Sequence, residues 1–404
     1  MTRRTHGLTR IGFALACVTV SVASRALPQS PPGFDAAWRD VSAFFHQRLD
    51  SAGIVGGSLW FLHGREVLAR EFHGLADRET RRAVDEHTIY HWASITKTFT
   101  GIAIMQLRDR GQLRLDDPVV HYLPELRGVH NPYGPMREIT IRQLLSHSAG
   151  FRMATWPWGG DKPWHPHEPT SWDQLVAMIP YTEILFEPGS RYSYSNPGIV
   201  FLGRIIELLT GDDYEVYIDK NILKPLEMYH SYFDHTPYHL LRDRSNNYYV
   251  ENGEITANGL DFDTGITVSN GGLNAPISDM VKYLAFMTGA SDTEDAILRR
   301  SSLEEMWQPV VDVPGDSGAA TQSAMGLAYF VLDHGGLRLI GHTGSQMAFL
   351  SFFYVDPATG AAAIAACNTV GIETDGIAMP DTRGVLNELQ ELLFENVFPL
   401  FKRR

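Results

Sequence analysis

Cysteine is scarce in this chain, with only 2 in 404 residues. A disulfide framework is therefore excluded, and a chain of this length buries enough surface to need none. Basic residues are outnumbered, 34 against 47 acidic ones, and they form no cluster. Nucleic-acid-binding surfaces and surfaces that hold anionic membranes need such clusters, so we expect neither partner. What is present is a 44% hydrophobic composition without heptad periodicity, typical of a globular protein rather than a disordered or coiled-coil one.

The first residues are typical of a targeting segment. Arg3, Arg4 and Arg10 precede the apolar stretch Ile11–Ala23, and Ser24-Arg25-Ala26 offers a small-x-small cleavage site. A basic segment, a short apolar core and small residues make a secretory signal, and this core is too short to span a bilayer. We therefore assign residues 1–26 to a signal peptide. We expect an exported, periplasmic or secreted protein with no membrane span after the signal is removed.

Three alternatives to simple secretion stay open. Thr2-Arg3-Arg4 is compatible with a twin-arginine signal, and Ala14–Cys17 is an imperfect lipoprotein box that would anchor the chain through Cys17. The absence of acidic residues before Asp35 also suits a mitochondrial transit peptide, but the single apolar block favours secretion. Once Cys17 leaves with the signal, Cys367 has no partner, and we interpret it as a buried small hydrophobic residue.

Strand patterns lie at both ends of the chain and helical patterns lie between them. Apolar residues at helical spacing predict an opening helix around Trp38–Leu49, and Val385–Phe398 predicts a closing one. The predicted strands are Ser58–Leu62, Glu66–Phe72, Leu327–Leu332, Leu337–Gly341, Phe349–Val355 and Ala361–Cys367. We therefore predict an α+β fold. Its antiparallel sheet, flanked by helices, is built from residues 27–116 and 253–404, with an all-α insertion at 117–252 and chemistry in the cleft between the lobes.

Ser94 and Lys97 form an S-x-x-K motif at the start of a strong helical pattern. On a helix the two side chains lie one turn apart on the same face, within hydrogen-bonding reach. A serine hydroxyl is a weak nucleophile unless a base takes its proton. Lysine can be that base if burial and nearby positive charge lower its pKa from about 10.4 to about 7–8. Alone the motif is weak, because a capping Ser beside a solvated Lys looks the same.

Two further segments carry polar groups suited to such chemistry. Tyr192–Gly198 places Tyr194 and Asn196 on a loop before a predicted helix, where a tyrosine can carry a proton and an asparagine can bind a substrate amide. A tight turn capped by Asn196 is the alternative. Gly341–Ser345 follows a strand and offers the imidazole of His342, a hydroxyl and backbone N–H groups, though His342 is equally compatible with a surface residue.

The order and spacing of S-x-x-K, Y-S-N and H-T-G resemble the three-motif pattern of the serine β-lactamase and penicillin-binding-protein superfamily. The resemblance covers nearly the whole chain after residue 26. Further stretches look like signatures of the class C β-lactamase and D-alanyl-D-alanine peptidase branch: Leu144–Gly150, Phe186–Gly189, Pro225–Met228, and Gly271-Gly272-Leu273 followed by Ser278-Asp279-Met280. Residues 27–404 are accordingly expected to form a β-lactamase-related serine hydrolase domain of β-lactamase/transpeptidase-like fold.

The resemblance implies a role for each motif residue. The implied catalytic residues are Ser94 as the acylated nucleophile, Lys97 as its base and Tyr194 as the proton relay. His342, in the H-T-G motif on a late strand, is the fourth. The backbone N–H groups of Ser94 and Ser345 would form the oxyanion hole, and the substrate-binding positions would be Asn196, Thr343, Gly344 and Ser345. No metal or cofactor is implied, and the partner is a small-molecule or short-peptide substrate. Oligomeric state is left open by the sequence.

The sequence departs from β-lactamases proper at His342, where those enzymes carry lysine. An imidazole binds the penicillin carboxylate less well than a fixed cation, because its charge fades above about pH 6.5. We therefore expect a D-peptidase/carboxypeptidase-like or esterase-like serine hydrolase that cleaves an amide or ester. The alternatives are a β-lactamase proper and a non-catalytic sensor or scaffold that kept the pocket.

Three other patterns are interpreted as decoys or pocket walls. Gly315-Asp316-Ser317-Gly318 imitates a chymotrypsin-type signature, but this chain lacks that architecture. His165-Pro166-His167-Glu168 contains prolines that prevent a helix from aligning metal ligands, so we expect a loop. Tryptophans also gather in this region, where they suit either the core or a wall that binds apolar acyl groups. They are Trp156, Trp158, Trp164 and Trp172.

Overall fold

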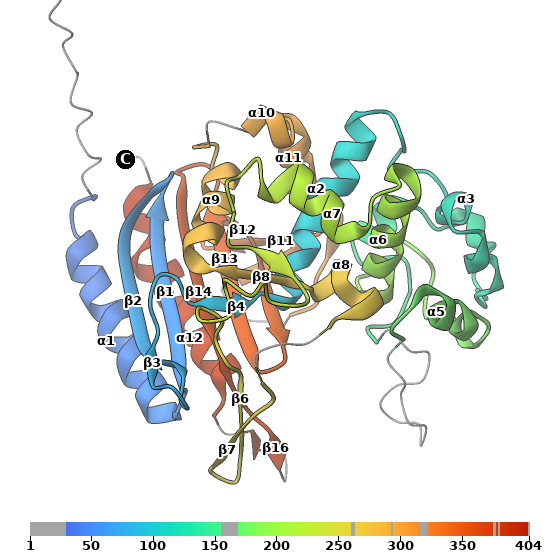
Figure 1. Ribbon diagram of the computed structural model, residues 1–404. Helices are drawn as coiled ribbons and strands as arrows, with labels where there is room; N and C mark the ends of the chain where they lie inside the picture. Colours follow the sequence, from blue (N-terminus) through green and yellow to red (C-terminus); the bar gives the residue numbers. More distant parts are fainter. Residues whose placement is uncertain are drawn as a thin grey trace, which may run out of the picture.

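The computed structural model describes residues 30–154, 169–259, 263–291, 294–315, 321–374, 377–378 and 380–402. At its centre is a nine-stranded sheet of antiparallel neighbours in the order β3-β2-β1-β14-β13-β12-β11-β10-β9 (Figure 1). The two ends of the chain build this one sheet together, and helices flank it, which confirms the predicted α+β class. Its strands are β1 (Gly56–His63), β2 (Glu66–Asp77), β3 (Arg82–Ala83), β9 (Val311–Asp312), β10 (Thr321–Met325), β11 (Phe330–His334), β12 (Leu337–Gln346), β13 (Phe349–Asp356) and β14 (Ala361–Cys367).

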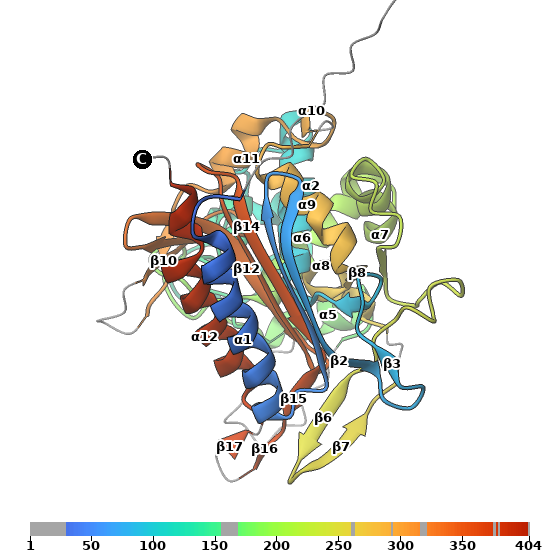
Figure 2. The ribbon, with the colours of Figure 1, turned by 90° about the vertical axis from the view of Figure 1, so that its left-hand side faces the viewer.

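Side chains of the sheet alternate between two apolar cores. On β1, Leu59 and Phe61 face the first core with α1 (Phe34–Ala52) and α12 (Thr382–Asn396), whereas Trp60 faces the second. Figure 2 shows α1 and α12 side by side over one face of the sheet. β14 pairs with β1 and β13 and is buried on both faces, which explains its unbroken apolar run. Cys367 lies in this core, where burial raises the pKa of its thiol to about 12.

Helices cover the opposite face of the sheet. The α2 helix (Thr96–Asp109) is buried along most of its length and packs against α6 (Asn196–Thr210) and α8 (Val268–Gly271). The other helices are α3 (Val119–Tyr122), α4 (Ile141–Leu145), α5 (Trp172–Met178), α7 (Tyr214–Ile218), α9 (Ile277–Met287), α10 (Glu294–Ile297) and α11 (Arg300–Met306). Within the described ranges, no helix has both the length and the apolar character needed to cross a membrane.

Strand boundaries differ from the prediction around β10 and β11. Leu327–Tyr329 is not strand, because its backbone turns to bond the helices: Leu327 N–H donates to Met306 O and Ala328 N–H to Leu145 O, both at 2.8 Å. The β10 strand was not predicted, since its sequence Thr-Gln-Ser-Ala-Met lacks a clear apolar alternation. β12 also runs on through Gln346 instead of ending at Gly341.

The range 117–252 contains two short strands in addition to its helices. β5 (Tyr232–Phe233) pairs with β8 (Leu273–Pro276), which also pairs with β4 (Ile89–His91). β6 (Tyr248–Glu251) pairs with β7 (Glu254–Ala257) and with β15 (Thr369–Gly371). These strands lie outside the nine-stranded sheet, as does the pair β16 (Glu373–Thr374) and β17 (Ile377–Ala378). Segments of two to four residues carry too little periodicity to be predicted from sequence.

Candidate active site

Ser94 lies in a single 3-10 turn, η1 (Ala93–Ile95), directly ahead of α2. The preceding Ala93 has a left-handed φ of 49°, a strained conformation for a residue with a Cβ atom. Neither η1 nor α2 has a side-chain cap, so the Ser94 hydroxyl does not serve as a helix cap. The capping interpretation of this motif is therefore wrong, and the hydroxyl is directed to other partners.

Lys97, in the first turn of α2, is completely buried. Its Nζ lies 3.0 Å from Ser94 Oγ and 2.7 Å from the carbonyl oxygen of Asn270 in α8. Burial lowers the pKa of Lys97 far below that of an exposed lysine. The expected contribution of a nearby positive charge is absent, because desolvation accounts for this shift. The amine therefore releases its proton readily and can accept one from the adjacent hydroxyl.

Tyr194 reaches the same hydroxyl from the loop before α6. Its side chain hydrogen-bonds that of Ser94, and Lys97 Nζ lies 5.0 Å from the centre of its ring. Burial raises the pKa of the phenol, and the hydrogen bond with Ser94 opposes that rise. The cap of α6 is Ser195, whose Oγ accepts from Gly198 N–H at 3.1 Å. The alternative in which Asn196 caps this turn is therefore wrong.

The third motif, Gly341–Ser345, lies on β12, and this strand packs against η1. A Cβ atom on Gly344 would lie 2.3 Å from the carbonyl oxygen of Trp92, so this close approach requires glycine. His342 is buried, and its ring centre lies 6.3 Å from that of Tyr194. Burial, with a smaller contribution from Lys97, lowers the pKa of His342 to about 3. The expectation that His342 loses its charge only near pH 6.5 is therefore wrong, and it is not a surface residue.

Four of the predicted residues thus meet in space: Ser94, Lys97, Tyr194 and His342. The remaining predicted residues are close in sequence to Tyr194 or His342. Among the described residues, none of them hydrogen-bonds Ser94. They are Asn196, Thr343, Gly344 and Ser345. Asn196 Oδ1 is buried and makes no hydrogen bond within the described part of the chain. Thr343 is partly buried, and Ser345 is exposed, with Oγ accepting from Arg383 Nη2 at 3.1 Å.

Sequence reasoning missed three residues around this cluster. Asn270 directly precedes the Gly271-Gly272-Leu273 stretch, and its backbone carbonyl, which any residue type provides, binds Lys97. His147 lies inside the Leu144–Gly150 stretch, with its ring centre 4.4 Å from that of Tyr194. Arg383, at the start of α12, gave no motif signal at all. These residues come close to the site only through the tertiary fold.

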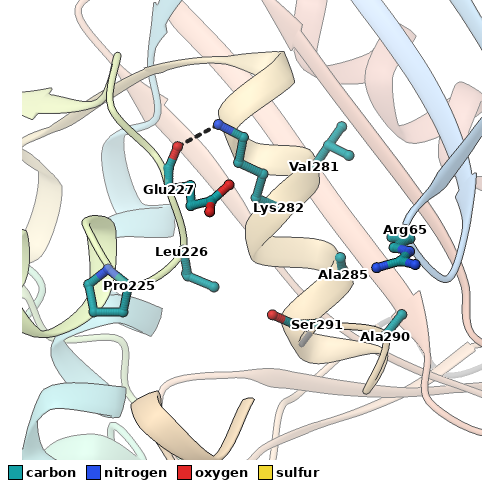
Figure 3. A pocket seen from close by; sticks show the side chains of 9 residues that line it. All are labelled: Arg65, Pro225, Leu226, Glu227, Val281, Lys282, Ala285, Ala290 and Ser291. Atoms are coloured by element: carbon teal, nitrogen blue, oxygen red, sulfur yellow. Dashed lines mark hydrogen bonds between the residues drawn. The ribbon is translucent and has the colours of Figure 1, made fainter. Parts of the chain in front are cut away.

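Other candidate sites lie elsewhere in the molecule. The side chains of His334, Glu391 and Glu395 come within 4.8 Å of one another and could hold a cation, but the two glutamates are exposed. A cavity of about 220 Å³ lies between α9, the β1–β2 turn and the loop around Glu227, and its lining includes none of the predicted site residues (Figure 3). The His165–Glu168 stretch, Trp156, Trp158, Trp164 and most of Gly315–Gly318 lie outside the described residues, whereas Trp172 begins α5.

Known proteins similar to this chain include Protein flp of Staphylococcus aureus (strain NCTC 8325 / PS 47). It is 25% identical over 329 residues, which cover 79% of this chain and 60% of that protein. The chain thus spans less than two thirds of the length of this relative. Esterase EstB of Burkholderia gladioli is 31% identical over 197 residues, covering 46% of this chain and 49% of the esterase.

The fold is similar to that of solved penicillin-binding-protein homologues. The octameric homologue from Pyrococcus abyssi superposes with a TM-score of 0.71 at 27% identity, covering 88% of this chain and 77% of that one. A family model described as Beta-lactamase matches residues 41–387, which include every residue of the cluster around Ser94. The sequence resemblance is thereby confirmed, and the chain belongs to the beta-lactamase family.

Proposed function

We propose that this chain is a serine hydrolase that cleaves an ester or amide through an acyl-enzyme intermediate on Ser94. The observation that carries the proposal is the placement of one hydroxyl between a buried amine and a buried phenol. Ser94 Oγ lies 3.0 Å from Lys97 Nζ and hydrogen-bonds Tyr194. Such a triplet supplies a nucleophile, a base and a second proton carrier at one point.

In the proposed acylation step, Lys97 Nζ takes the proton of Ser94 Oγ while the oxygen bonds to the carbonyl carbon of the substrate. The backbone N–H groups of Ser94 and Ser345 would hold the negative oxygen of the tetrahedral intermediate. Collapse of this intermediate breaks the bond to the leaving group, which receives a proton through Tyr194. In deacylation, water attacks the acyl-Ser94 ester, and the same groups return the proton to Oγ.

The state of His342 favours esters and D-amino-acid amides over β-lactams. A penicillin carries a carboxylate that a cation binds well, but His342 is buried with a pKa of about 3 and is therefore uncharged near neutral pH. The similarity to Esterase EstB supports an ester as the substrate.

The experiment is intact-mass spectrometry and turnover with three probes: a p-nitrophenyl ester, a D-alanyl-D-alanine peptide and a fluorescent penicillin. We expect ester or peptide turnover, an acyl adduct on Ser94 and no adduct in Ser94→Ala. A stable adduct without turnover would indicate a sensor. Fast penicillin hydrolysis would indicate a β-lactamase proper. Equal hydrolysis by the wild type and by Ser94→Ala would overturn the assignment of the nucleophile.

We also propose export of the protein, with residues 1–26 as its signal and residues 27–404 as the hydrolase domain. The basic and apolar order of the first residues supports this, although they lie outside the described residues. Within the domain, the site draws Ser94 and His342 from the predicted α/β lobe and Tyr194 from the predicted insertion at 117–252. N-terminal sequencing of the exported protein tests the proposed cleavage, and an uncleaved chain would contradict it.

A further inference from the structure

His147 lies in the turn that follows α4, in a conformation that few residues adopt. Its φ is 53°, in the left-handed region, where asparagine, aspartate and histidine are the favoured residues after glycine. The side chain is buried. A strained backbone around a buried polar side chain persists only where its surroundings fix it, and such positions gather at functional sites.

Three contacts join His147 to the segment that carries Tyr194. The His147 carbonyl oxygen accepts from Ser193 N–H at 2.8 Å, and its Nδ1 accepts from Ser195 N–H at 3.1 Å. These two amides flank Tyr194 in the chain. The imidazole also lies against the phenol ring, with centres 4.4 Å apart and planes inclined by 33°. One residue thus fixes the backbone on both sides of Tyr194 and one face of its ring.

We propose that His147 is a positioning residue that holds Tyr194 in place for proton transfer at Ser94, an inference that rests on the proposed function. Because Nδ1 accepts from a backbone N–H, it carries no proton, and the ring proton sits on Nε2. Protonation of Nδ1 would break the bond to Ser195. Burial, with Lys97 and His342 as smaller contributions, lowers the pKa of His147 and so keeps the accepting form.

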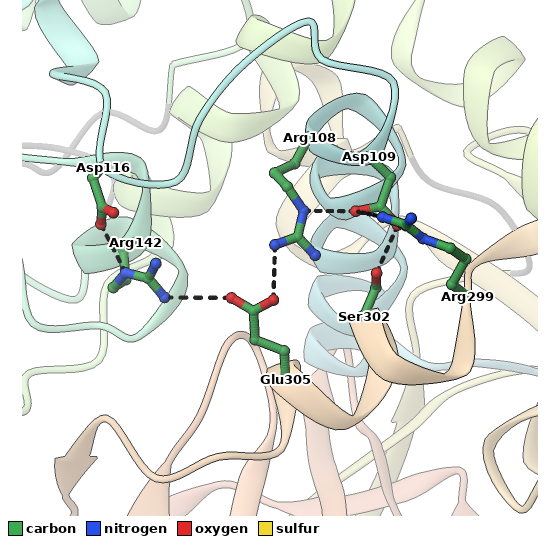
Figure 4. A network of polar contacts seen from close by, with 7 residues as sticks. All are labelled: Arg108, Asp109, Asp116, Arg142, Arg299, Ser302 and Glu305. Atoms are coloured by element: carbon green, nitrogen blue, oxygen red, sulfur yellow. Dashed lines mark hydrogen bonds and ion pairs between the residues drawn. The ribbon is translucent and has the colours of Figure 1, made fainter.

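The turn that presents His147 is itself anchored to the rest of the helical face. Ser146 Oγ donates to the carbonyl oxygen of Arg142 in α4 at 2.9 Å. The Arg142 side chain binds Asp116 at 2.9 Å and Glu305 of α11 at 3.8 Å, and Glu305 binds Arg108 of α2 at 2.7 Å. Figure 4 shows how this network ties α4 to α2 and α11. The turn is therefore held relative to the helix that carries Lys97.

The test compares two variants that both tolerate the left-handed backbone, His147→Gly and His147→Asn. Both remove the imidazole ring, but the Asn side-chain oxygen takes the place of Nδ1 as an acceptor for Ser195 N–H. We expect His147→Gly to lower kcat on the p-nitrophenyl ester by about 100-fold, with KM within about threefold, since misplaced catalytic groups cost rates of this order. We expect His147→Asn to recover at least about tenfold of that loss.

Two further measurements separate positioning from a general loss of structure. In a Tyr194→Phe background, His147→Gly should slow the reaction by less than about threefold, because the residue that it positions is already disabled. Amide hydrogen exchange of Ser195 should be fast in His147→Gly and protected in the wild type and in His147→Asn. The control is His87→Gln, whose side chain is 68% exposed, and it should change neither rate nor exchange.

Each failure has its own signature. If the wild type shows neither turnover nor an adduct on Ser94, the proposed function fails, and the exchange of the Ser195 amide alone decides whether His147 holds this segment. Equal protection of Ser195 in the wild type and in His147→Gly would overturn the inference. So would an undiminished effect of His147→Gly in the Tyr194→Phe background.

Discussion

The two faces of the central sheet differ in what they bury. The face under α1 and α12 buries mainly aromatic and aliphatic side chains, among them Phe45, Phe61 and Phe394. On the opposite face, which α2, α6 and α8 cover and where Ser94 lies, the structure also buries groups that can carry charge, including Lys97, His147 and His342. Apolar burial stabilises the fold, whereas buried ionisable groups cost stability unless they are neutralised or paired. Both faces bury large apolar cores that stabilise the fold. Only the second also buries Lys97, His147 and His342, whose burial costs stability and suits them to reactive chemistry.

Replacing the buried amine should separate the two properties most strongly. Lys97→Met removes the proposed base and should lower kcat/KM on an ester by about 10³–10⁴-fold. The folded-state pKa of Lys97 is depressed, so below the pKa of an exposed lysine the unfolded chain binds protons more tightly here than the folded chain, and the buried amine costs stability. Methionine removes this cost, and we expect thermal unfolding measured by calorimetry to shift to a higher temperature. A variant that keeps wild-type activity, or that unfolds at a lower temperature, would contradict the contrast between the faces.

A cavity on the opposite face should produce the reverse result. Phe61 is fully buried between Phe34, Phe398 and Phe401, on the side of the sheet away from Ser94. Phe61→Ala should lower the free energy of unfolding by about 3–5 kcal/mol, because it removes a buried ring and leaves a cavity. Urea unfolding measures the loss. The folded fraction should keep its specific activity within about twofold, and a large loss of activity without a loss of stability would refute this separation.

Acid should weaken the fold through its buried histidines. Burial lowers the pKa of both His91 and His342 to about 3 and depresses that of His147 as well. The unfolded chain therefore takes up protons first, and stability present above about pH 6.5 is lost as the pH falls towards 3. Each group adds a slope of about 1.4 kcal/mol per pH unit.

Urea unfolding at pH 7, 6, 5 and 4 measures this slope. His342→Asn should reduce it by about one such increment, whereas His87→Gln, at an exposed position, should leave it unchanged. An identical pH dependence in all three proteins would show that His342 does not stay neutral on folding.

The smallest expected effect is at the surface of the apolar face. Arg48 of α1 binds Glu388 of α12 through two hydrogen bonds, at 2.9 and 2.8 Å, but both side chains are more than a third exposed. Arg48→Gln should lower the free energy of unfolding by no more than about 0.5 kcal/mol, since solvent screens such pairs. The same urea titration measures it. A loss as large as that of Phe61→Ala would mean that charge pairing, rather than apolar burial, joins these helices.

Local patterns were enough to predict the features that depend on neighbouring residues. Short apolar runs predicted β1, β13 and β14, and apolar residues at helical spacing predicted α1 and α12. A spacing of three residues places Ser94 and Lys97 within reach on one helical turn, whatever the rest of the chain does. Gly211 ends α6 in a left-handed conformation, which glycine adopts without the strain of a Cβ atom.

Only the tertiary structure decided the electrostatics of the site. The pKa of Lys97 is depressed because α8 and the Tyr194 loop exclude water from its amine, and these segments lie about 170 and about 100 residues away in the chain, respectively. Tertiary packing also causes the depressed pKa of His342 and the contacts between His147 and the Tyr194 segment. The spacing of two residues in the sequence fixes their distance only within about one turn of a helix. The desolvation of a side chain depends on every segment that packs around it. The sequence alone therefore determined which reactive groups are present, and folding determined their protonation and orientation.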